Sequence, residues 1–285
     1  MRLRDLQVVL DASPRSQVLL GIATELARSN DAHLTGLCPL ELLLPDDLGF
    51  ALGGYPEVMA LQSAVDQLQS QAMEQAVTIE AGFREALRRE GISGDWRTAP
   101  GAVGEAIAFH ARHADLTVIG QADPDHRRPP AGRHMIEEVL LAAGRPLLIV
   151  PYAGSYPTIG RTVLVAWTET REAARAASDA LGLIDPAASV TVLTMVRPGN
   201  GAQPEVPGAE IAAHLARHGL SVTAARTVGG DGISEADVLL SYAADLGADL
   251  LVMGGYGHSR VRELTLGGVT RGVLQHMTLP VLISH

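Results

Sequence analysis

The second part of the chain alternates short apolar runs with amphipathic stretches. Residues 163–167 (VLVAW) and 248–254 (ADLLVMG) are almost continuously apolar, whereas residues 172–183 place small apolar side chains three or four positions apart. Continuous Val, Leu and Ile runs are typical of parallel strands covered on both faces, and the spacing of three or four is typical of a helix. The pattern predicts strands at 163–167, 189–196, 220–228, 248–254 and 280–284 and helices at 172–183, 208–219, 234–247 and 266–277.

The first part of the chain repeats this pattern. Residues 113–120 (HADLTVIG) resemble residues 247–254 (GADLLVMG) at an offset of 134 positions, without a net gap as far as the closing apolar runs. Near the two starts, residues 6–13 resemble residues 163–170 at an offset of 157 positions. The chain therefore holds two copies of one unit, and the first copy carries 23 more residues between these anchors.

Two copies predict two domains, residues 1–151 and 161–285, joined by the Pro- and Gly-containing segment 151–160. The alternation of strands and helices predicts an α/β fold in which each domain is a doubly wound, five-stranded parallel sheet. Right-handed crossovers favour the strand order 3-2-1-4-5, which places a ligand crevice at the carboxyl ends of strands 1 and 4. In the second copy Thr168 and Gly254 then lie on opposite sides of that crevice.

The extra residues of the first copy surround residues 39–59 and precede a long predicted helix at about 60–90. Proline, glycine and acidic residues in 39–59 indicate a loop, and its leucines indicate that it packs on something. A lid or an oligomer contact is one interpretation, and a self-packed surface loop is the other.

Composition narrows the classes of partner. The net charge of −10 argues against nucleic acid and anionic membranes as partners. No run of 18 apolar residues and no signal-peptide pattern is found, so a cytoplasmic protein is expected. Cys38 is the single cysteine and is expected to be a buried apolar residue rather than a metal ligand.

Glycines cluster after the fourth predicted strand of the second copy. Gly254, Gly257, Gly267 and Gly268 follow the spacing G-x2-G-x9-G-G and run into the last predicted helix. Glycines let the backbone approach a ligand closely, and a helix N-terminus favours an anion, so these residues predict a phosphate cradle. The stretch is neither a Walker A loop nor a G-x-G-x-x-G motif. Three basic side chains of this loop could contact phosphates or be solvated: His258, Arg260 and Arg262.

With these glycines, the terminal GGVTRGVL and the closing PVLI, the sequence resembles the universal stress protein family, twice over nearly the whole chain. Its ATP-binding members carry the motif G-x2-G-x9-G-[ST], which Gly254, Gly257 and Gly267 match. The resemblance implies an adenine nucleotide alpha-hydrolase-like fold, a regulatory stress-response role and pairing through the last strand. ATP is the nucleotide it favours, with AMP or ADP as alternatives and Mg²⁺ as a candidate companion of the phosphates.

The resemblance also gives a candidate nucleotide-binding set: Ala166, Trp167, Thr168, Met195, Val196, Met253, Gly254, Gly257, Gly267, Gly268, Val269 and Thr270. Two members depart from the family pattern. Gly268 replaces the motif's Ser or Thr, and Thr168 stands where the family's binders place an Asp facing the nucleoside. An alternative follows: the sites of both copies are degenerate, and the protein is a structural or protein-interaction module that binds no nucleotide.

The first copy departs from the family pattern in the opposite way, since it keeps the signature after strand 1 and lacks most of the phosphate glycines. Asp11 and Ser13 match the signature after strand 1, but only Gly120 remains of the phosphate glycines. Five other residues replace Gly255, Tyr256, Gly257, Gly267 and Gly268, in this order: Gln121, Ala122, Asp123, Arg133 and His134. Asp123 would repel a phosphate, so this copy is expected not to bind a triphosphate. Arg127, Arg128, Arg133 and His134 could serve another anion, contact the other half or be solvated.

No pattern in the sequence specifies a reaction or a metal site. His214 and His218 are spaced as helical metal ligands, but no further Cys or His cluster supports them, and His110 and His113 have no more support. An enzyme that acts on a phosphorylated small molecule is a further interpretation, but the sequence offers no identifiable catalytic group for it. The greatest activity expected is therefore slow ATP hydrolysis. The halves are expected to pair through residues 146–150 and 280–284, and a homodimer is expected as well.

Overall fold

The computed structural model describes residues 2–41, 55–122, 135–196, 206–229, 232–256 and 268–285. The first half contains β1 (Asp5–Val9), α1 (Arg15–Asn30), β2 (His33–Glu41), α2 (Tyr55–Glu90), β3 (Gly94–Gly101), α3 (Val103–Ala111), β4 (Leu116–Gly120), α4 (Met135–Ala143) and β5 (Leu147–Val150). The second half contains β6 (Thr162–Trp167), α5 (Arg171–Ala180), β7 (Ser189–Val196), α6 (Ala209–Arg217), β8 (Ser221–Val228), α7 (Glu235–Leu246), β9 (Leu250–Gly254), α8 (Gly268–His276) and β10 (Val281–Ser284).

All ten strands form a single sheet in the order β3-β2-β1-β4-β5-β10-β9-β6-β7-β8. Each half thus has the expected order 3-2-1-4-5, and every strand pair within a half is parallel. β5 and β10 pair antiparallel, with Leu148 opposite Leu282. The expected pairing of the halves through their closing strands is confirmed, and it leaves neither closing strand as an exposed edge.

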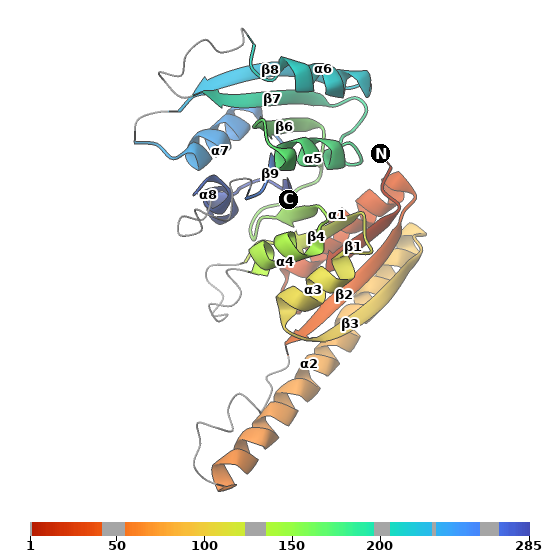
Figure 1. The fold of residues 1–285 in the computed structure, drawn as a ribbon. Helices are drawn as coiled ribbons and strands as arrows, with labels where there is room; N and C mark the ends of the chain where they lie inside the picture. The colour runs from red at the N-terminus through yellow and green to blue at the C-terminus, as the bar shows by residue number, and fades with distance from the viewer. Residues whose placement is uncertain (1, 42–54, 123–134, 197–205, 230–231, 257–267) are drawn as a thin grey trace.

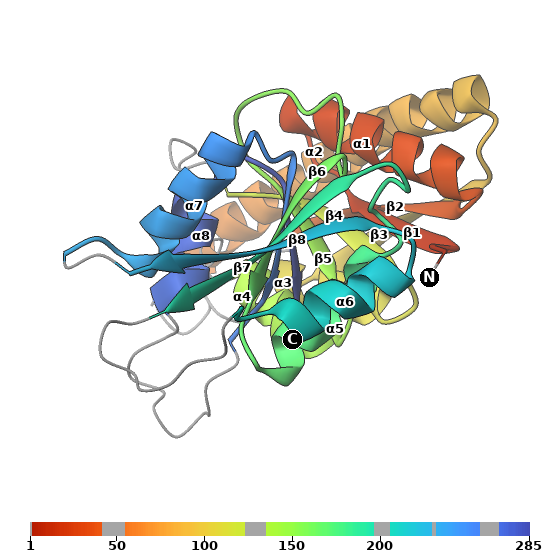
Figure 2. The same cartoon turned by 90° about the horizontal axis from the view of Figure 1, so that it is seen from above.

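Helices cover both faces of this sheet (Figures 1 and 2). One apolar core packs α1, α2, α5 and α6 against one face, and it includes Val8 of the first half and Val165 of the second. The other core packs α3, α4, α7 and α8 against the opposite face, and it includes Ile119 and Leu251. Because both cores contain residues of both halves, the halves share continuous apolar layers.

The insertion of the first half is only partly described. Residues 42–54 of the segment 39–59 lie outside the described residues, so its interpretation as a lid, an oligomer contact or a surface loop stays open. α2 begins at Tyr55, earlier than expected, and its first part extends away from the sheet (Figure 1). Cys38 is buried in β2, as expected. In the described part of the chain, no helix is both long enough and apolar enough to span a membrane.

Candidate functional site

Three neighbouring strands of the second half end beside one another. The sheet order places β9, β6 and β7 side by side, with Ala166 opposite Met253 and Trp167 opposite Thr194. Their carboxyl ends thereby gather much of the predicted set, namely Ala166, Trp167, Thr168, Met195, Val196, Met253 and Gly254. Trp167, Met195 and Val196 are half-buried and Thr168 is exposed. An aromatic ring and two apolar side chains are thus partly accessible at this edge.

The start of α8 completes this edge. β9 and β10 are parallel neighbours, so the helix that connects them runs back along the sheet and begins at the carboxyl end of β9. Its first residue, Gly268, is exposed, and a Cβ added there would meet no atom within 4 Å. Val269 is half-buried and Thr270 is buried. A side chain at position 268 therefore has room, whereas Gly257 and Gly267 lie outside the described residues.

Gly254 has a packing role that the sequence pattern did not indicate. A Cβ at this position would lie 2.5 Å from Ala173 N, in the first turn of α5. At the equivalent Gly120 the nearest atom would be Leu19 Cδ1, at 3.4 Å. The repeat places Ala176 of α5 where α1 has Leu19, and smaller side chains bring the helix closer to the strand. The packing of α5 requires glycine at 254 whether or not a ligand binds.

The turn after strand 1 differs between the halves. In the second half, Thr168 Oγ1 lies 3.2 Å from Thr170 Oγ1, and Thr170 caps α5 by accepting a hydrogen bond from Ala173 N. In the first half, Asp11 Oδ1 accepts hydrogen bonds from Ser13 N and from Ser16 Oγ, both at 2.9 Å. The Asp that matches the family signature thus holds its own turn together.

Thr194 and Gly208 were missed by the sequence reasoning. Thr194 Oγ1 is buried and has no hydrogen-bond partner among the described residues. Gly208, the N-cap of α6, adopts φ +80°, and a Cβ there would lie 3.1 Å from this oxygen and 3.7 Å from Trp167 Cδ1. A positive φ favours glycine, and the absent side chain leaves room beside the indole ring. The glycine preceding an amphipathic stretch was the only sequence signal.

Tyr256 connects the glycine stretch to the first half. It adopts φ +56°, an uncommon conformation for a bulky residue. Burial raises the pKa of the Tyr256 hydroxyl, and the Glu137 carboxylate of α4 raises it further, against the opposing charge of Arg271. The Tyr256 hydroxyl is therefore buried near Glu137 of the other copy.

Glu172 brings a negative charge to the same edge. Its side chain is 3% exposed, forms an ion pair with Arg171, and has its Cβ 2.9 Å from the position of a Cβ added to Gly254. Burial raises the pKa of the Glu172 carboxyl, but the hydrogen bond from Arg171 and nearby positive charge outweigh burial and hold it below its usual value. The carboxylate is therefore ionised at neutral pH, and nothing in the repeat pattern indicated its burial.

The first half uses one of the corresponding positions to join the two copies. Gln121 is buried, donates from Nε2 to Leu274 O at 2.8 Å, and accepts at Oε1 from Tyr152 N at 3.1 Å. Asp123, Arg127, Arg128, Arg133 and His134 lie outside the described residues. Within the described ranges, no cluster of His, Cys, Asp or Glu is arranged to hold a metal ion. His214 and His218 contact each other edge to face on the exposed side of α6.

Comparison with known proteins agrees with this fold. The model of the universal stress protein family matches residues 160–285. Universal stress protein Slr1230 of Synechocystis sp. is 44% identical over 46 residues, which cover 16% of this chain and only 16% of that relative. A universal stress protein from Archaeoglobus fulgidus superposes with a TM-score of 0.75, at 16% identity, over 98% of this chain and 95% of that chain.

A functionally unknown protein from Pseudomonas aeruginosa superposes with a TM-score of 0.60, at 15% identity, over 99% of this chain and 92% of that chain. At such identities these structures show the fold alone. They cover both halves, whereas the family model covers the second. The second half, residues 160–285, therefore matches the universal stress protein family.

Proposed function

We propose that this chain is a stress-response protein that binds an adenine nucleotide, ATP in the first place and AMP or ADP as alternatives, in its second half. The N-terminus of α8 is the observation that carries the proposal. Gly268 is exposed and an added Cβ would meet no atom within 4 Å, and the partial positive charge of a helix N-terminus favours a phosphate. The loop that carries Gly257 and Gly267 connects this helix to β9.

The neighbouring side chains suit a nucleoside. Trp167 offers an aromatic face, Met195 and Val196 offer apolar contacts, and Thr194 Oγ1 has no hydrogen-bond partner among the described residues. Thr168 is exposed at the end of β6 and can exchange one further hydrogen bond. Any Mg²⁺ would be held by the phosphates of the nucleotide, since Glu172 is already paired with Arg171.

Calorimetry on the full chain with ATP tests the proposal. Gly268→Asp places a carboxylate in open space at the N-terminus of α8, so it should fold and weaken ATP binding by about tenfold or more. Gly268→Ala is the matched control and should bind as the parent does. Gly257→Asp, which copies Asp123 of the first half, should abolish ATP binding. Equal affinity in the parent and both Asp variants would overturn the proposed site.

An interaction module without a nucleotide is the second candidate, and the buried carboxylate of Glu172 favours it. Analysis of the supernatant after denaturing freshly purified protein separates the two candidates. Release of a stoichiometric nucleotide would exclude the second candidate, whereas empty protein that also gives no heat with ATP would support it.

We also propose that the protein is cytoplasmic and forms a homodimer. Its negative charge makes it a poor ligand for nucleic acid or anionic membranes. Light scattering on the full chain tests the assembly, and a stable monomer would contradict the dimer.

A further inference from the structure

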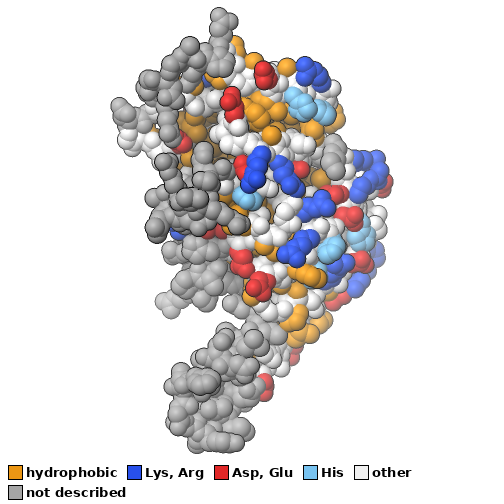
Figure 3. Space-filling model, viewed as in Figure 1, with side chains coloured by type: hydrophobic (Ala, Val, Ile, Leu, Met, Phe, Trp, Pro, Cys, Tyr) orange, Lys and Arg blue, Asp and Glu red, His pale blue; other side chains and the backbone are white. Residues whose placement is uncertain are grey.

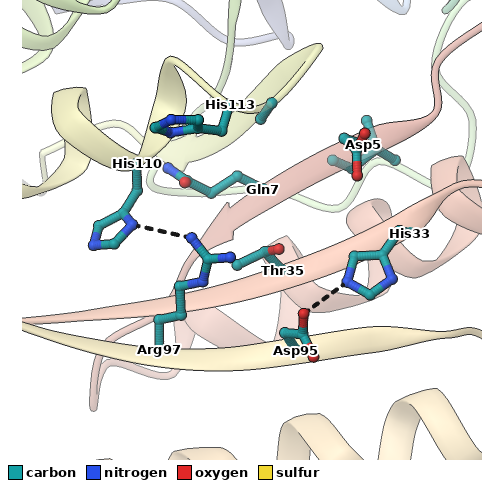
Figure 4. Close-up of a pocket in the computed structure, with 10 residues that line it drawn as sticks. Asp5, Gln7, His33, Thr35, Asp95, Arg97, His110 and His113 are labelled. Atoms are coloured by element: carbon teal, nitrogen blue, oxygen red, sulfur yellow. Dashed lines mark hydrogen bonds and ion pairs between the residues drawn. The ribbon is translucent and has the colours of Figure 1, made fainter.

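A recess of the first half lies at the other end of the strands from the proposed nucleotide site. Its volume is about 170 Å³, and it opens beside the amino-terminal parts of β1, β2 and β3, below the end of α3. Figure 4 shows Gln7, Arg97, His110 and His113 directed towards one end, and Asp5, His33 and Asp95 at the other. In Figure 3, arginine and histidine side chains gather with some carboxylates over this part of the molecule.

The first end of the recess is rich in hydrogen-bond donors. Gln7 is only 1% exposed, and its Nε2 has no partner among the described residues. Arg97 Nη1 donates to His110 Nδ1 at 3.3 Å, and no ion pair of Arg97 with a carboxylate is found in the described part of the chain. Burial lowers the pKa of His110, and the charges of Arg97 and His113 lower it further. This end therefore sets the Arg97 guanidinium beside the Gln7 amide and two imidazoles, and no carboxylate of the described residues forms an ion pair with that guanidinium.

The carboxylates of the recess are at the far end. His33 Nε2 lies 3.2 Å from Asp95 Oδ2, so the Asp95 carboxylate has a partner on the neighbouring strand. Asp5 is exposed, two residues before Gln7 on the same face of β1, and Figure 4 shows it away from Arg97 and His110. Neither carboxylate neutralises the donor end.

The second half shows that the fold does not need this polarity. Gln7 pairs in register with Thr35 and Thr117, and Leu164 pairs in the same way with Thr191 and Leu251. One strand further, the register equates Arg97 with Ala225. The repeat offset of 134 equates His110 and His113 with Ala244 and Gly247.

Leu164 and Leu251 are both fully buried in the second half. An apolar strand pair therefore packs well where the first half buries Gln7 and Thr117. A buried amide without a partner destabilises a protein, so its presence at one of two equivalent positions needs a local reason, and a ligand that accepts its hydrogen bond supplies one.

We propose that this recess binds a compact oxyanion, either inorganic phosphate or a short carboxylate, between the Gln7 amide, the Arg97 guanidinium and the His110 and His113 imidazoles. An oxyanion accepts hydrogen bonds from all of these donors, and the guanidinium offers two parallel N–H groups to it. The recess is smaller than the roughly 300–1,000 Å³ of pockets that hold drug-sized ligands, so it does not take a nucleotide.

Calorimetry on the full chain with inorganic phosphate, and separately with malonate, tests this site. Saturable binding of either anion is expected. In parallel, NMR titration of the imidazoles should show that the anion raises the pKa of His110, because it offsets Arg97 and His113, while Asp5, Asp95 and His33 face the other end. The anion that binds more tightly identifies which of the two sources the site prefers.

Variants that copy the second half locate the binding. Gln7→Leu and Arg97→Ala, singly, should each weaken the anion by about tenfold or more, the effect of losing a hydrogen bond to a charged group. Arg217→Ala removes an exposed arginine of α6 and should change nothing. Retained thermal stability of the Gln7→Leu chain would show that the loss is not unfolding.

Two results would overturn the site. One is the absence of saturable heat with both anions. The other is equal anion affinity in the parent and in the Gln7→Leu and Arg97→Ala variants, which would place the anion elsewhere, for example at α8. ATP binding to the second half is measured on the same variants, so failure of the proposed nucleotide site is distinguished from failure of this one.

Discussion

The two halves of the molecule share a strand order and differ in where they carry polar groups. The second half is apolar at Leu164 and Leu251 but has an exposed glycine, Gly268, at the start of α8. The first half has Gln7 and Thr117 at the equivalent strand positions, and at the position of Gly255 it has Gln121, which joins the two copies. The same backbone thus supports a candidate site at opposite ends of its strands in the two copies.

This difference separates what the fold requires from what a ligand could require. A residue type found at equivalent positions of both halves, such as Thr35 and Thr191, can be explained by packing alone. A residue that is costly in one half and replaced in the other needs a local reason. Gly254 shows that such a reason can be structural, since the close approach of α5 accounts for it.

The largest effect on stability is expected when the buried glutamine of the first half is copied into the second half. Leu164→Gln should lower the free energy of unfolding by about 3–5 kcal/mol, because it removes a buried leucine and buries an unpaired amide. The reverse change, Gln7→Leu, should leave stability equal or higher. Urea unfolding measures both. If Leu164→Gln lowers the free energy of unfolding by less than about 1 kcal/mol, the second half tolerates a polar side chain there. The contrast between Gln7 and Leu164 would then carry no information about a ligand.

A second pair of variants tests how closely α5 packs on β9 and α1 on β4. Gly254→Ala should cost about 1–3 kcal/mol, because the added Cβ would overlap the backbone of α5. Gly120→Ala should cost under about 1 kcal/mol, since Leu19 is the nearest contact and its end can move. Unfolding by urea gives both values. Equal costs would mean that α1 and α5 lie equally close to their strands.

The sequence predicted the fold well because apolar runs and repeat offsets are local signals. The runs at 248–254 and 280–284 became β9 and β10, and the pairing of β5 with β10 followed from two closing strands that needed cover. Gathering of the predicted residues at the ends of β6, β7 and β9 likewise followed from the strand order.

Other features depend on contacts between distant positions. Gln7, Arg97 and His110 meet only through the register of three strands and the end of α3, and each is an ordinary surface residue type when seen alone. The burial of Glu172 and the closeness of α5 to Gly254 depend on how far a helix of small residues sinks towards the sheet. No spacing along the chain encodes that distance.

A smaller effect is expected at a polar pair of the second half. Ser284 Oγ donates to Asp179 Oδ2 at 2.9 Å, where the repeat offsets place Ile22 and Val150 in the first half. Burial raises the pKa of Asp179, against the hydrogen bond from Ser284 and the charge of Arg175. The folded state therefore binds this proton more tightly than the unfolded state, so the group's contribution to stability falls as pH rises above the ordinary carboxyl range.

Asp179→Asn should remove that fall. The variant should match or exceed the parent at neutral pH, by at most about 1 kcal/mol, and the difference should disappear in acid, where Asp179 is protonated in both states. Urea unfolding at a series of pH values measures it. A parent that becomes more stable relative to the variant with rising pH would contradict the sign.

The smallest effect concerns the charge at the proposed nucleotide site. Glu172 of α5 stands where the repeat places Arg15 of α1, and Arg15 Nη1 donates to Gly154 O at 2.7 Å. A carboxylate near the phosphates opposes them, although its pairing with Arg171 and the solvent reduce the effect. Glu172→Gln should therefore tighten ATP binding by about two- to threefold, equivalent to about 0.5 kcal/mol of screened repulsion.

Calorimetry at low ionic strength, where screening is weakest, gives the clearest measurement of this change. Asp245→Asn, near the end of α7, removes the same charge at the opposite end of the strands and is the matched control. If both variants tighten ATP equally, the gain reflects the net charge of −10 rather than the position of Glu172. If neither does, the phosphates do not approach α5, and the crevice must hold them on the α8 side alone.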